Sequence, residues 1–414
     1  MKVHIIGGGI IGLCTAYYLQ QEGAEVVLVD KDDWKDGCSH GNAGMIVPSH
    51  FIPLAAPGVM AQGIRWMFSN SSPFYIRPRL DLSLIQWIWQ FYRSCRPEKV
   101  ERAIPVLRDF NWLSQQLYKE LNTNPELEFA YEDKGLLMLC QKKSTFEEEV
   151  RHAEKAVELG LKAEVFSASQ IHQVEQNLPT NAEGAVYYPG DAHLHPNQLM
   201  EQLRKYLLQQ GVQFIPSTYI TGFAERGGSI SHIKTQKGER IEVEQLVLAA
   251  GSWSARVLKA LQLKMLLQDG KGYSLTLQNP DRRPSVPTIL TEAKVAVTPM
   301  GTDLRIGGTL EISNLDPSIN MSRLRGIVAS MPRYYPDFEI ETPPQQAVWH
   351  GFRPCTPDGL PYIGRMPGFT NLTVATGHAM MGLSLGPASG KLVAEIICNK
   401  KTSLEIKLFN PGRF

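Results

Sequence analysis

The chain has no strong charge of either sign, because 42 lysine and arginine residues stand against 41 aspartate and glutamate residues. Without a basic excess, we expect no nucleic acid partner. No apolar run is long enough to span a bilayer, and no secretory signal pattern precedes the first expected strand. Together with a hydrophobic content of 43%, these absences predict a globular protein of the cytoplasm.

The sequence has few cysteines and no C-x-x-C pair, which predicts reduced thiols rather than a disulfide framework. Two histidines, His193 and His195, form an H-x-H pattern that suits a metal ion. No third ligand follows at a suitable spacing, so we expect no metal site. The six scattered cysteines are Cys14, Cys38, Cys95, Cys140, Cys355 and Cys398.

A glycine-rich turn lies near the beginning of the chain. An apolar strand at 4–6 leads into Gly7, Gly9 and Gly12, which have the spacing G-x-G-x-x-G, and a helical pattern follows until Gly23. The first glycine permits a tight turn, the second lets the backbone approach a pyrophosphate, and the third allows close packing of helix and strand. The helix N-terminus attracts the anion.

An acidic residue completes the pattern. A second strand at 25–29 ends in Asp30, about 20 residues after the turn, where an acid that binds ribose is expected. Strand, turn, helix, strand and acid in register predict a dinucleotide site rather than a chance glycine turn. This pattern suits both NAD and FAD.

Later segments favour a flavin. A buried strand at 246–250 runs into Gly251 and a helix near Ser252, which is a second strand-glycine-helix junction. A further helix begins at about Gly386, and its N-terminal dipole suits a flavin carbonyl that gains negative charge. The alternative is an ordinary strand-to-helix turn.

An aromatic stretch at 60–96 alternates with arginines, and Ile85, Ile88, Trp89 and Tyr92 fall on one helical face. Such a face suits a membrane interface. We favour the other interpretation, in which the aromatic rings pack into their own domain.

The region 268–350 has period-2 stretches such as YSLTL and KVAVTP, which predict a mostly antiparallel sheet.

Several motifs together resemble the FAD-dependent amine oxidoreductases related to D-amino-acid oxidase, glycine oxidase and sarcosine oxidase. The segments SHGNAGM and IRWMFSNSSPFYIRPRLDLSLIQWIWQFYRSC are most like those of bacterial D-amino-acid dehydrogenases. The other motifs are GGGIIGLCTAYYL with VVLVDKD, VLAAGSWS, GKGYSLTL, RIGGTLE, GFRPCTPDGLPYIGR and ATGHAMMGLSLGPASGK.

The resemblance implies an α/β fold with two domains. A Rossmann-like FAD-binding domain would be built from the separated segments 1–50, 191–265 and 351–414. The segments 51–190 and 266–350 would form an α+β substrate domain with a mostly antiparallel sheet.

The resemblance also implies the site. The FAD would be bound without a covalent link, because Cys355 does not match the position at which some sarcosine oxidases attach their flavin. The glycines of the first turn would hold the pyrophosphate, Asp30 the ribose, and Ile220 would cover the adenine. The full set of residues implied for FAD is Gly7, Gly9, Gly12, Asp30, Lys31, Ser39, Asn42, Ala43, Gly44, Met45, Ile220, Gly251, Met381, Gly382 and Leu383.

Three residues are the catalytic candidates. Arg353 matches the arginine that binds the substrate carboxylate in members similar to glycine oxidase, and a planar guanidinium suits such bidentate binding; the alternative is an arginine in an interdomain salt bridge. Tyr273 would add a hydroxyl to the same carboxylate, unless it packs in the sheet. His378 opens the turn 378–383 at the flavin's pyrimidine end. Met380 stands where glycine oxidase has a second arginine.

The implied activity is oxidation of a D-amino acid to a 2-keto acid and ammonia, with hydride transfer to flavin N5. Alternatives are a glycine or sarcosine oxidase, a D-hydroxyproline dehydrogenase, and a non-catalytic flavin-binding redox sensor. A dehydrogenase would pass electrons to a quinone, and such enzymes often work at the membrane. We therefore expect an amino acid substrate, a quinone or other acceptor, and a cytoplasmic protein with peripheral contact with the inner face of the membrane as an open alternative.

Overall fold

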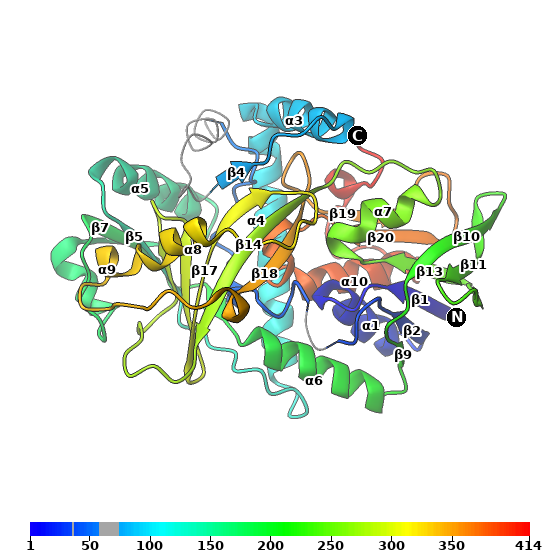
Figure 1. The fold of residues 1–414 in the computed structure, drawn as a ribbon, viewed down its shortest axis with the longest axis horizontal. Coiled ribbons are helices and arrows are strands. Elements are labelled where there is room, and N and C mark those ends of the chain that lie inside the picture. Colours follow the sequence, from blue (N-terminus) through cyan, green and yellow to red (C-terminus); the bar gives the residue numbers. More distant parts are fainter. Residues whose placement is uncertain (35–36, 58–73) are drawn as a thin grey trace.

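The computed structural model describes residues 1–34, 37–57 and 74–414. The part of the aromatic stretch at 60–73 lies outside these described residues. Figure 1 shows a sheet of mostly parallel strands and its helices at one end of the molecule and a larger sheet at the other, with the long helix α4 (Pro97–Asn122) behind them.

A six-stranded sheet carries the glycine-rich turn. Its central strand β1 pairs in parallel with β2 on one side and β13 on the other, so that His4 lies opposite Val27 and Leu246. Only β19 runs antiparallel to its neighbour. The five parallel strands therefore have their carboxyl ends at one edge of the sheet. In spatial order they are β19 (Tyr362–Arg365), β20 (Leu372–Thr376), β13 (Gln245–Leu248), β1 (Lys2–Ile6), β2 (Glu25–Val29) and β9 (Gln213–Ile215).

Helix α1 (Ile10–Gln21) is apolar on all sides and buried between β1 and helix α10 (Gly386–Ile397). The two helices approach closely because α10 carries glycine at the contact. A Cβ added to Gly390 would lie 2.4 Å from the backbone carbon of Cys14. Helix α6 (Pro196–Gln209) packs on α1 from another side, and α4 packs on α10.

The large sheet is mostly antiparallel, as predicted, with β5 parallel to β15 and β4 parallel to β17. Helices α5 (Lys143–Glu158), α8 (Met321–Val328) and α9 (Met331–Tyr334) belong to the same half of the molecule (Figure 1). The strands in order are β18 (Trp349–Cys355), β14 (Gln268–Leu277), β17 (Asp303–Ile312), β16 (Val295–Met300), β15 (Thr288–Leu290), β5 (Leu136–Cys140), β7 (Gly184–Tyr188) and β6 (Glu164–Ser167), with β4 (Phe74–Ile76) beside β17.

Smaller elements accompany the two sheets. A three-stranded sheet follows β9, and a two-stranded pair joins the loop after β2 to the segment before α6. The short elements are β3 (Met45–Ile46), β8 (Ala192–His193), β10 (Ile220–Arg226), β11 (Ser229–Thr235), β12 (Arg240–Glu242), α7 (Ser254–Lys259) and the 3-10 turns η1 (Ala168–Gln173), η2 (Gly251–Trp253), η3 (Gln345–Ala347), η4 (Ala379–Gly382) and η5 (Lys407–Phe409).

Two elements lie across the expected domain boundaries, which themselves stay a prediction. Helix α4, expected in the substrate domain, buries Phe110 and Leu117 in the same apolar core as α1 and α10. Strand β18 pairs with β14 of the large sheet, although the segment from 351 was expected in the FAD-binding domain.

Helix α3 (Leu82–Ser94) has apolar side chains on two faces. Trp87 and Phe91 stack on each other, 5.0 Å apart, and are buried, and Ile88 packs against the same cluster. The interpretation we favoured is correct for these residues, although Ile88 does not share the face of Ile85 and Trp89 as the sequence predicted. The other face, however, leaves Leu82, Ile85, Trp89 and Tyr92 exposed. Among the described residues, no helix is long and apolar enough to cross a membrane.

The contact between α1 and α10 can be tested by filling it. We expect Gly390→Ala to lower the free energy of unfolding by about 1–3 kcal/mol, because the added methyl group would meet the backbone of α1. Urea unfolding of the FAD-saturated protein measures this. Gly190→Ala is the matched control, since a Cβ there meets nothing within 4 Å. An equal effect of both changes would contradict the close contact.

Candidate functional site

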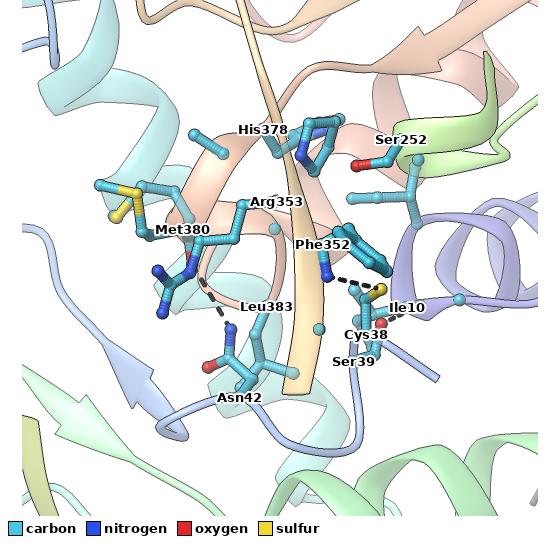
Figure 2. Close-up of a pocket in the computed structure, with 18 of the residues that line it drawn as sticks. Ile10, Cys38, Ser39, Asn42, Ser252, Phe352, Arg353, His378, Met380 and Leu383 are labelled. Atoms are coloured by element: carbon cyan, nitrogen blue, oxygen red, sulfur yellow. Dashed lines mark hydrogen bonds between the residues drawn. The ribbon is translucent and has the colours of Figure 1, made fainter. Parts of the chain in front are cut away.

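A cavity of about 780 Å³ lies between the carboxyl edge of the six-stranded sheet and the large sheet. Of the residues that the sequence singled out, all but Gly12 and Gly44 line it. These two face protein instead: a Cβ on Gly12 would lie 1.9 Å from the Gly7 carbonyl oxygen, and one on Gly44 would lie 2.3 Å from that of Leu194. Figure 2 shows part of the lining, drawn from segments far apart in the sequence.

The glycine turn is built so that only backbone faces the cavity. Gly7 has φ +114°, and a Cβ on it would lie 2.4 Å from the carbonyl oxygen of Ala249 at the end of β13. Asp30 accepts hydrogen bonds from the N–H groups of Gly8 (2.5 Å) and Asp32 (2.9 Å). Burial nevertheless raises the pKa of the Asp30 carboxyl above its ordinary value. The turn and the acid thus form one hydrogen-bonded unit at the N-terminus of α1.

Ser39 reaches the same helix terminus from the next loop. Its Oγ accepts a hydrogen bond of 3.0 Å from the N–H of Ile10, in the first turn of α1. A Cβ on Gly9 would lie 3.4 Å from that hydroxyl oxygen. The loop therefore crosses the helix N-terminus at Gly9, where no side chain separates it from the helix backbone. Figure 2 shows Ser39 beside Ile10.

Arg305 fixes this loop from the large sheet, a role that the motif RIGGTLE, which begins with this residue, did not predict. Its guanidinium donates to the carbonyl oxygens of His40 (2.6 Å) and Asn42 (2.8 Å). Ser274 Oγ donates to the carbonyl oxygen of Gly41 at 3.1 Å. Burial lowers the pKa of Arg305 to about 10, so the guanidinium stays charged at neutral pH. Three consecutive carbonyls thus point away from the cavity toward the sheet. The motif does not reveal this role because the partners of Arg305 are backbone atoms of a distant loop.

Lys31, Trp253 and Ile220 form another part of the cavity wall. Lys31 Nζ lies 4.4 Å from the ring centre of Trp253, a cation–π contact, and pairs with Asp32 at 2.5 Å. Ile220 is 7% exposed and begins β10 beside them. Gly251 has φ +52°, and its carbonyl oxygen accepts from Thr376 Oγ1 at 3.0 Å. Both strand-glycine junctions therefore border the same cavity.

Arg353 lies on β18 and lines the cavity. Its guanidinium lies over Gly272 on the neighbouring strand, where a Cβ would be 2.3 Å from it. It donates to the carbonyl oxygen of Thr309, and within the described residues it has no acidic partner. This is not the interdomain salt bridge considered as an alternative. Burial lowers the pKa of Arg353, and Figure 2 shows its guanidinium near Met380 and Asn42.

Tyr273 does not face Arg353, so its expected hydrogen bond to the same carboxylate needs correction. Side chains alternate along a strand, and Gly272 is on the Arg353 face of β14, which puts Tyr273 on the opposite face. Its ring is 1% exposed, and its hydroxyl lies 3.3 Å from Glu311 Oε2 and accepts from the N–H of Asn320 at 3.1 Å. Tyr273 therefore borders the cavity while its hydroxyl is used by Glu311 and Asn320 within the large-sheet half of the molecule.

His378 is held as a neutral ring behind the turn 378–383. Its Nε2 lies 2.8 Å from Ser389 Oγ in α10, and burial lowers its pKa to about 3. The turn itself is fixed by Asn42 Nδ2, which donates to the carbonyl oxygen of Met380 at 3.4 Å. The loop after β2 and the turn before α10 thus meet across the cavity (Figure 2).

The H-x-H pair lies away from any group of ligands. His193 Nε2 is 3.8 Å from Glu132, and burial lowers its pKa to about 4. Among the described residues there is no group of three histidine, cysteine or acidic side chains that could hold a metal ion.

The residues present fit an FAD. Gly7 and Gly12 keep side chains out of the turn at the α1 N-terminus, as a pyrophosphate requires, and the lining of the same cavity includes Ser39 and Arg353. The profile of the family "DAO: FAD dependent oxidoreductase" matches residues 2–396. The chain belongs to this family. It is therefore an FAD-dependent oxidoreductase.

Relatives cover the whole chain. It is 29% identical over 413 residues to the D-amino acid dehydrogenase of Helicobacter pylori, covering 99% of this chain and 98% of that protein. It is 30% identical over 411 residues to that of Granulibacter bethesdensis, covering 98% and 97%. Glycine oxidase from Geobacillus kaustophilus shares the fold, with a TM-score of 0.78, 22% identity and coverage of 100% and 98%.

The buried neutral state of His378 predicts a pH dependence. Below its ordinary pKa of 6.5 the unfolded chain takes up a proton that the folded protein excludes down to about pH 3. The free energy of unfolding therefore falls as the pH falls from 6.5, by up to about 3 kcal/mol from this group at pH 4. Urea unfolding of the FAD-saturated protein and of His378→Gln at pH 7 and pH 4 measures it.

The difference between the two proteins should shrink toward pH 4, because the variant lacks the titrating ring. Parallel losses of stability in both proteins would show that His378 is protonated inside the fold.

Proposed function

We propose that the protein oxidises a D-amino acid to the 2-keto acid and ammonia. The observation that carries this proposal is Arg353: a guanidinium in the cavity, partly covered by protein, with no acidic partner among the described residues. A cation in such a site favours an anionic ligand, and a planar fork binds a carboxylate through two hydrogen bonds. The D-amino acid dehydrogenase names of the relatives support the choice of substrate.

The chain's own residues position the substrate. Arg353 binds the carboxylate, and Gly272 leaves room for the guanidinium beside β14. Asn42 and Met380, joined by their hydrogen bond, border the same space. With the carboxylate held in this way, the Cα–H of the substrate is directed at the part of the cavity lined by Asn42, Ala43 and Met45. This orientation reduces the entropy cost of reaching the transition state.

FAD, when bound, supplies the two-electron chemistry by accepting a hydride from Cα at N5. The amine must be neutral when the hydride leaves. The resulting imino acid hydrolyses in water to the 2-keto acid and ammonia. None of these steps needs an ionised histidine, in accord with the neutral state of His378.

The alternatives within this chemistry are glycine, sarcosine and D-hydroxyproline. Met380 makes the wall beside Arg353 apolar, which favours a substrate with a side chain over glycine, whose Cα carries none. A redox sensor that binds flavin alone has no use for an unpaired arginine in its cavity. The same arginine therefore supports an enzyme over a sensor.

The test is anaerobic reduction of the flavin. D-amino acids should bleach the visible flavin band, and Arg353→Met should raise KM for them by about 100-fold or more while FAD stays bound, because a buried charge-assisted pair is lost. Arg226→Met, at an exposed position on β10, is the control and should change neither.

Glycine, sarcosine, D-proline and the L-amino acids belong in the same panel. Bleaching by one of these in preference to D-amino acids would replace the proposed substrate. Equal bleaching by Arg353→Met and the wild-type protein would remove the carboxylate-binding role.

We further propose that the electrons pass to a membrane quinone, with helix α3 at the bilayer surface. Trp87, Ile88 and Phe91 on one face of α3 line the cavity, while Ile85 and Trp89 on the other face are exposed by 55% and 58%. Exposed Arg93 and Arg96 follow at the end of the helix. Aromatic and apolar side chains beside cations are typical of segments that lie in a membrane interface.

Sedimentation with vesicles that contain anionic lipid tests this surface. Trp89→Ser should weaken binding about tenfold, because a large apolar side chain no longer leaves water. Trp112→Ser is the control, since Trp112 on α4 is 57% exposed. No binding of the wild-type protein would remove the membrane from the proposal, and rapid reoxidation of the reduced flavin by air would replace the quinone with oxygen.

A further inference from the structure

The cavity contains a histidine that the proposed function does not use. His50 lies five residues after Met45 and lines the same cavity as Arg353. The backbone N–H of His50 donates a hydrogen bond of 3.0 Å to the Val47 carbonyl oxygen, which forms a turn at this point. The neighbouring wall is mostly apolar, formed by Met45, Val47, Ile52, Met138 and Ile289.

Two residues fix the imidazole of His50. Ser49 donates its hydroxyl hydrogen to Asp191 Oδ2 at 2.5 Å and its N–H to Asp191 Oδ1 at 3.1 Å. Burial raises the pKa of Asp191 to about 7, and above that pH the ionised carboxylate takes the serine hydrogen. The serine oxygen then accepts a hydrogen bond from His50 Nδ1, which lies 3.1 Å away. Asp191 is 1% exposed, so the three groups form a chain that leads from the protein interior to the cavity wall.

This chain determines which ring nitrogen carries the proton. A neutral imidazole has one N–H and one bare nitrogen, and with Nδ1 as the donor the bare nitrogen is Nε2. Burial lowers the pKa of His50 to about 4, with Lys294 adding to the effect and Glu149 opposing it, so the ring is neutral at physiological pH. In the described part of the chain the hydrogen bond of the ring is that of Nδ1 with Ser49, which leaves Nε2 for a ligand.

We propose that His50 is a specificity-determining residue, whose Nε2 accepts a hydrogen bond from a hydroxyl group on the substrate side chain. The inference rests on the proposed function, because it assumes that Arg353 binds the carboxylate of the same substrate. A site with few polar groups in an apolar wall selects strongly for the ligand that pairs with them. Ser49 and Asp191 act through His50 as positioning residues.

Isosteric substrate pairs test this role. D-serine and D-2-aminobutyrate differ only by hydroxyl against methyl, and D-homoserine and D-norvaline extend the same comparison by one methylene. We expect the wild-type protein to reduce its flavin with a higher kcat/KM for the hydroxyl member of at least one pair. In His50→Leu that preference should fall by about tenfold, the effect of losing one hydrogen bond to a ligand.

Three further variants separate the hydrogen bond from packing. His50→Gln should retain part of the preference, because its amide oxygen can take the place of Nε2. Ser49→Ala should reduce the preference without removing it, since the ring loses its fixed tautomer. Met138→Leu changes the apolar wall alone and should alter both members of a pair equally. FAD content and urea unfolding verify that each variant is folded.

The outcomes are distinct. A hydroxyl preference that falls in His50→Leu and returns in His50→Gln supports the role. Equal rates for both members of each pair, or a preference unchanged in His50→Leu, would overturn it while leaving the D-amino acid as substrate. Absence of flavin reduction by any amino acid would overturn both the proposed function and this inference.

Discussion

The site depends on how closely three backbone segments approach one another around the start of helix α1. Gly7 touches the end of β13, Gly12 packs on Gly7, and Gly390 of α10 lies on the backbone of Cys14. Any side chain at these contacts would push α1 away from the sheet or from α10. These contacts hold the buried helix in place. Its N-terminus therefore lies at the carboxyl edge of the strands and borders the cavity.

The large sheet contributes two arginines to the site, Arg305 and Arg353, and these differ in how many hydrogen bonds they make to protein. Arg305 is buried, but it donates to the carbonyl oxygens of His40 and Asn42, and these bonds fix the loop that crosses the α1 N-terminus. Arg353 is also covered by protein and donates to one carbonyl oxygen, that of Thr309. A guanidinium has five N–H donors in a planar fork, so Arg353 has donors left for a ligand. One arginine thus fixes the loop, while the other can bind a carboxylate.

Local patterns predicted the parts of the site that depend on local structure. The glycine spacing, Asp30 and the junction at Gly251 could be found because each consists of a few neighbouring residues with a definite backbone requirement. The hydrogen bond expected of Tyr273 was wrong because the face to which a strand side chain points depends on which strands pair and in what register, and the sequence does not show that pairing. Arg305 and the chain from Asp191 to His50 were missed because their partners lie 142 to 265 residues away. The two faces of α3 were ambiguous for another reason: an apolar helix shows the same pattern whether one face or both are covered.

Charge and hydrogen bonding have separate roles in the cavity, on the function proposed for it. A permanently charged guanidinium in a poorly solvated site attracts any carboxylate, and so cannot distinguish one amino acid from another. Discrimination then has to come from neutral groups, because a second buried charge would raise the cost of desolvation for every substrate. His50, which burial keeps neutral and Ser49 orients, satisfies this requirement. A hydroxyl on the substrate side chain would pair with Nε2, and an apolar substrate side chain would leave Nε2 without a hydrogen bond. An unpaired buried acceptor is costly, and so the same atom that favours one substrate disfavours the other.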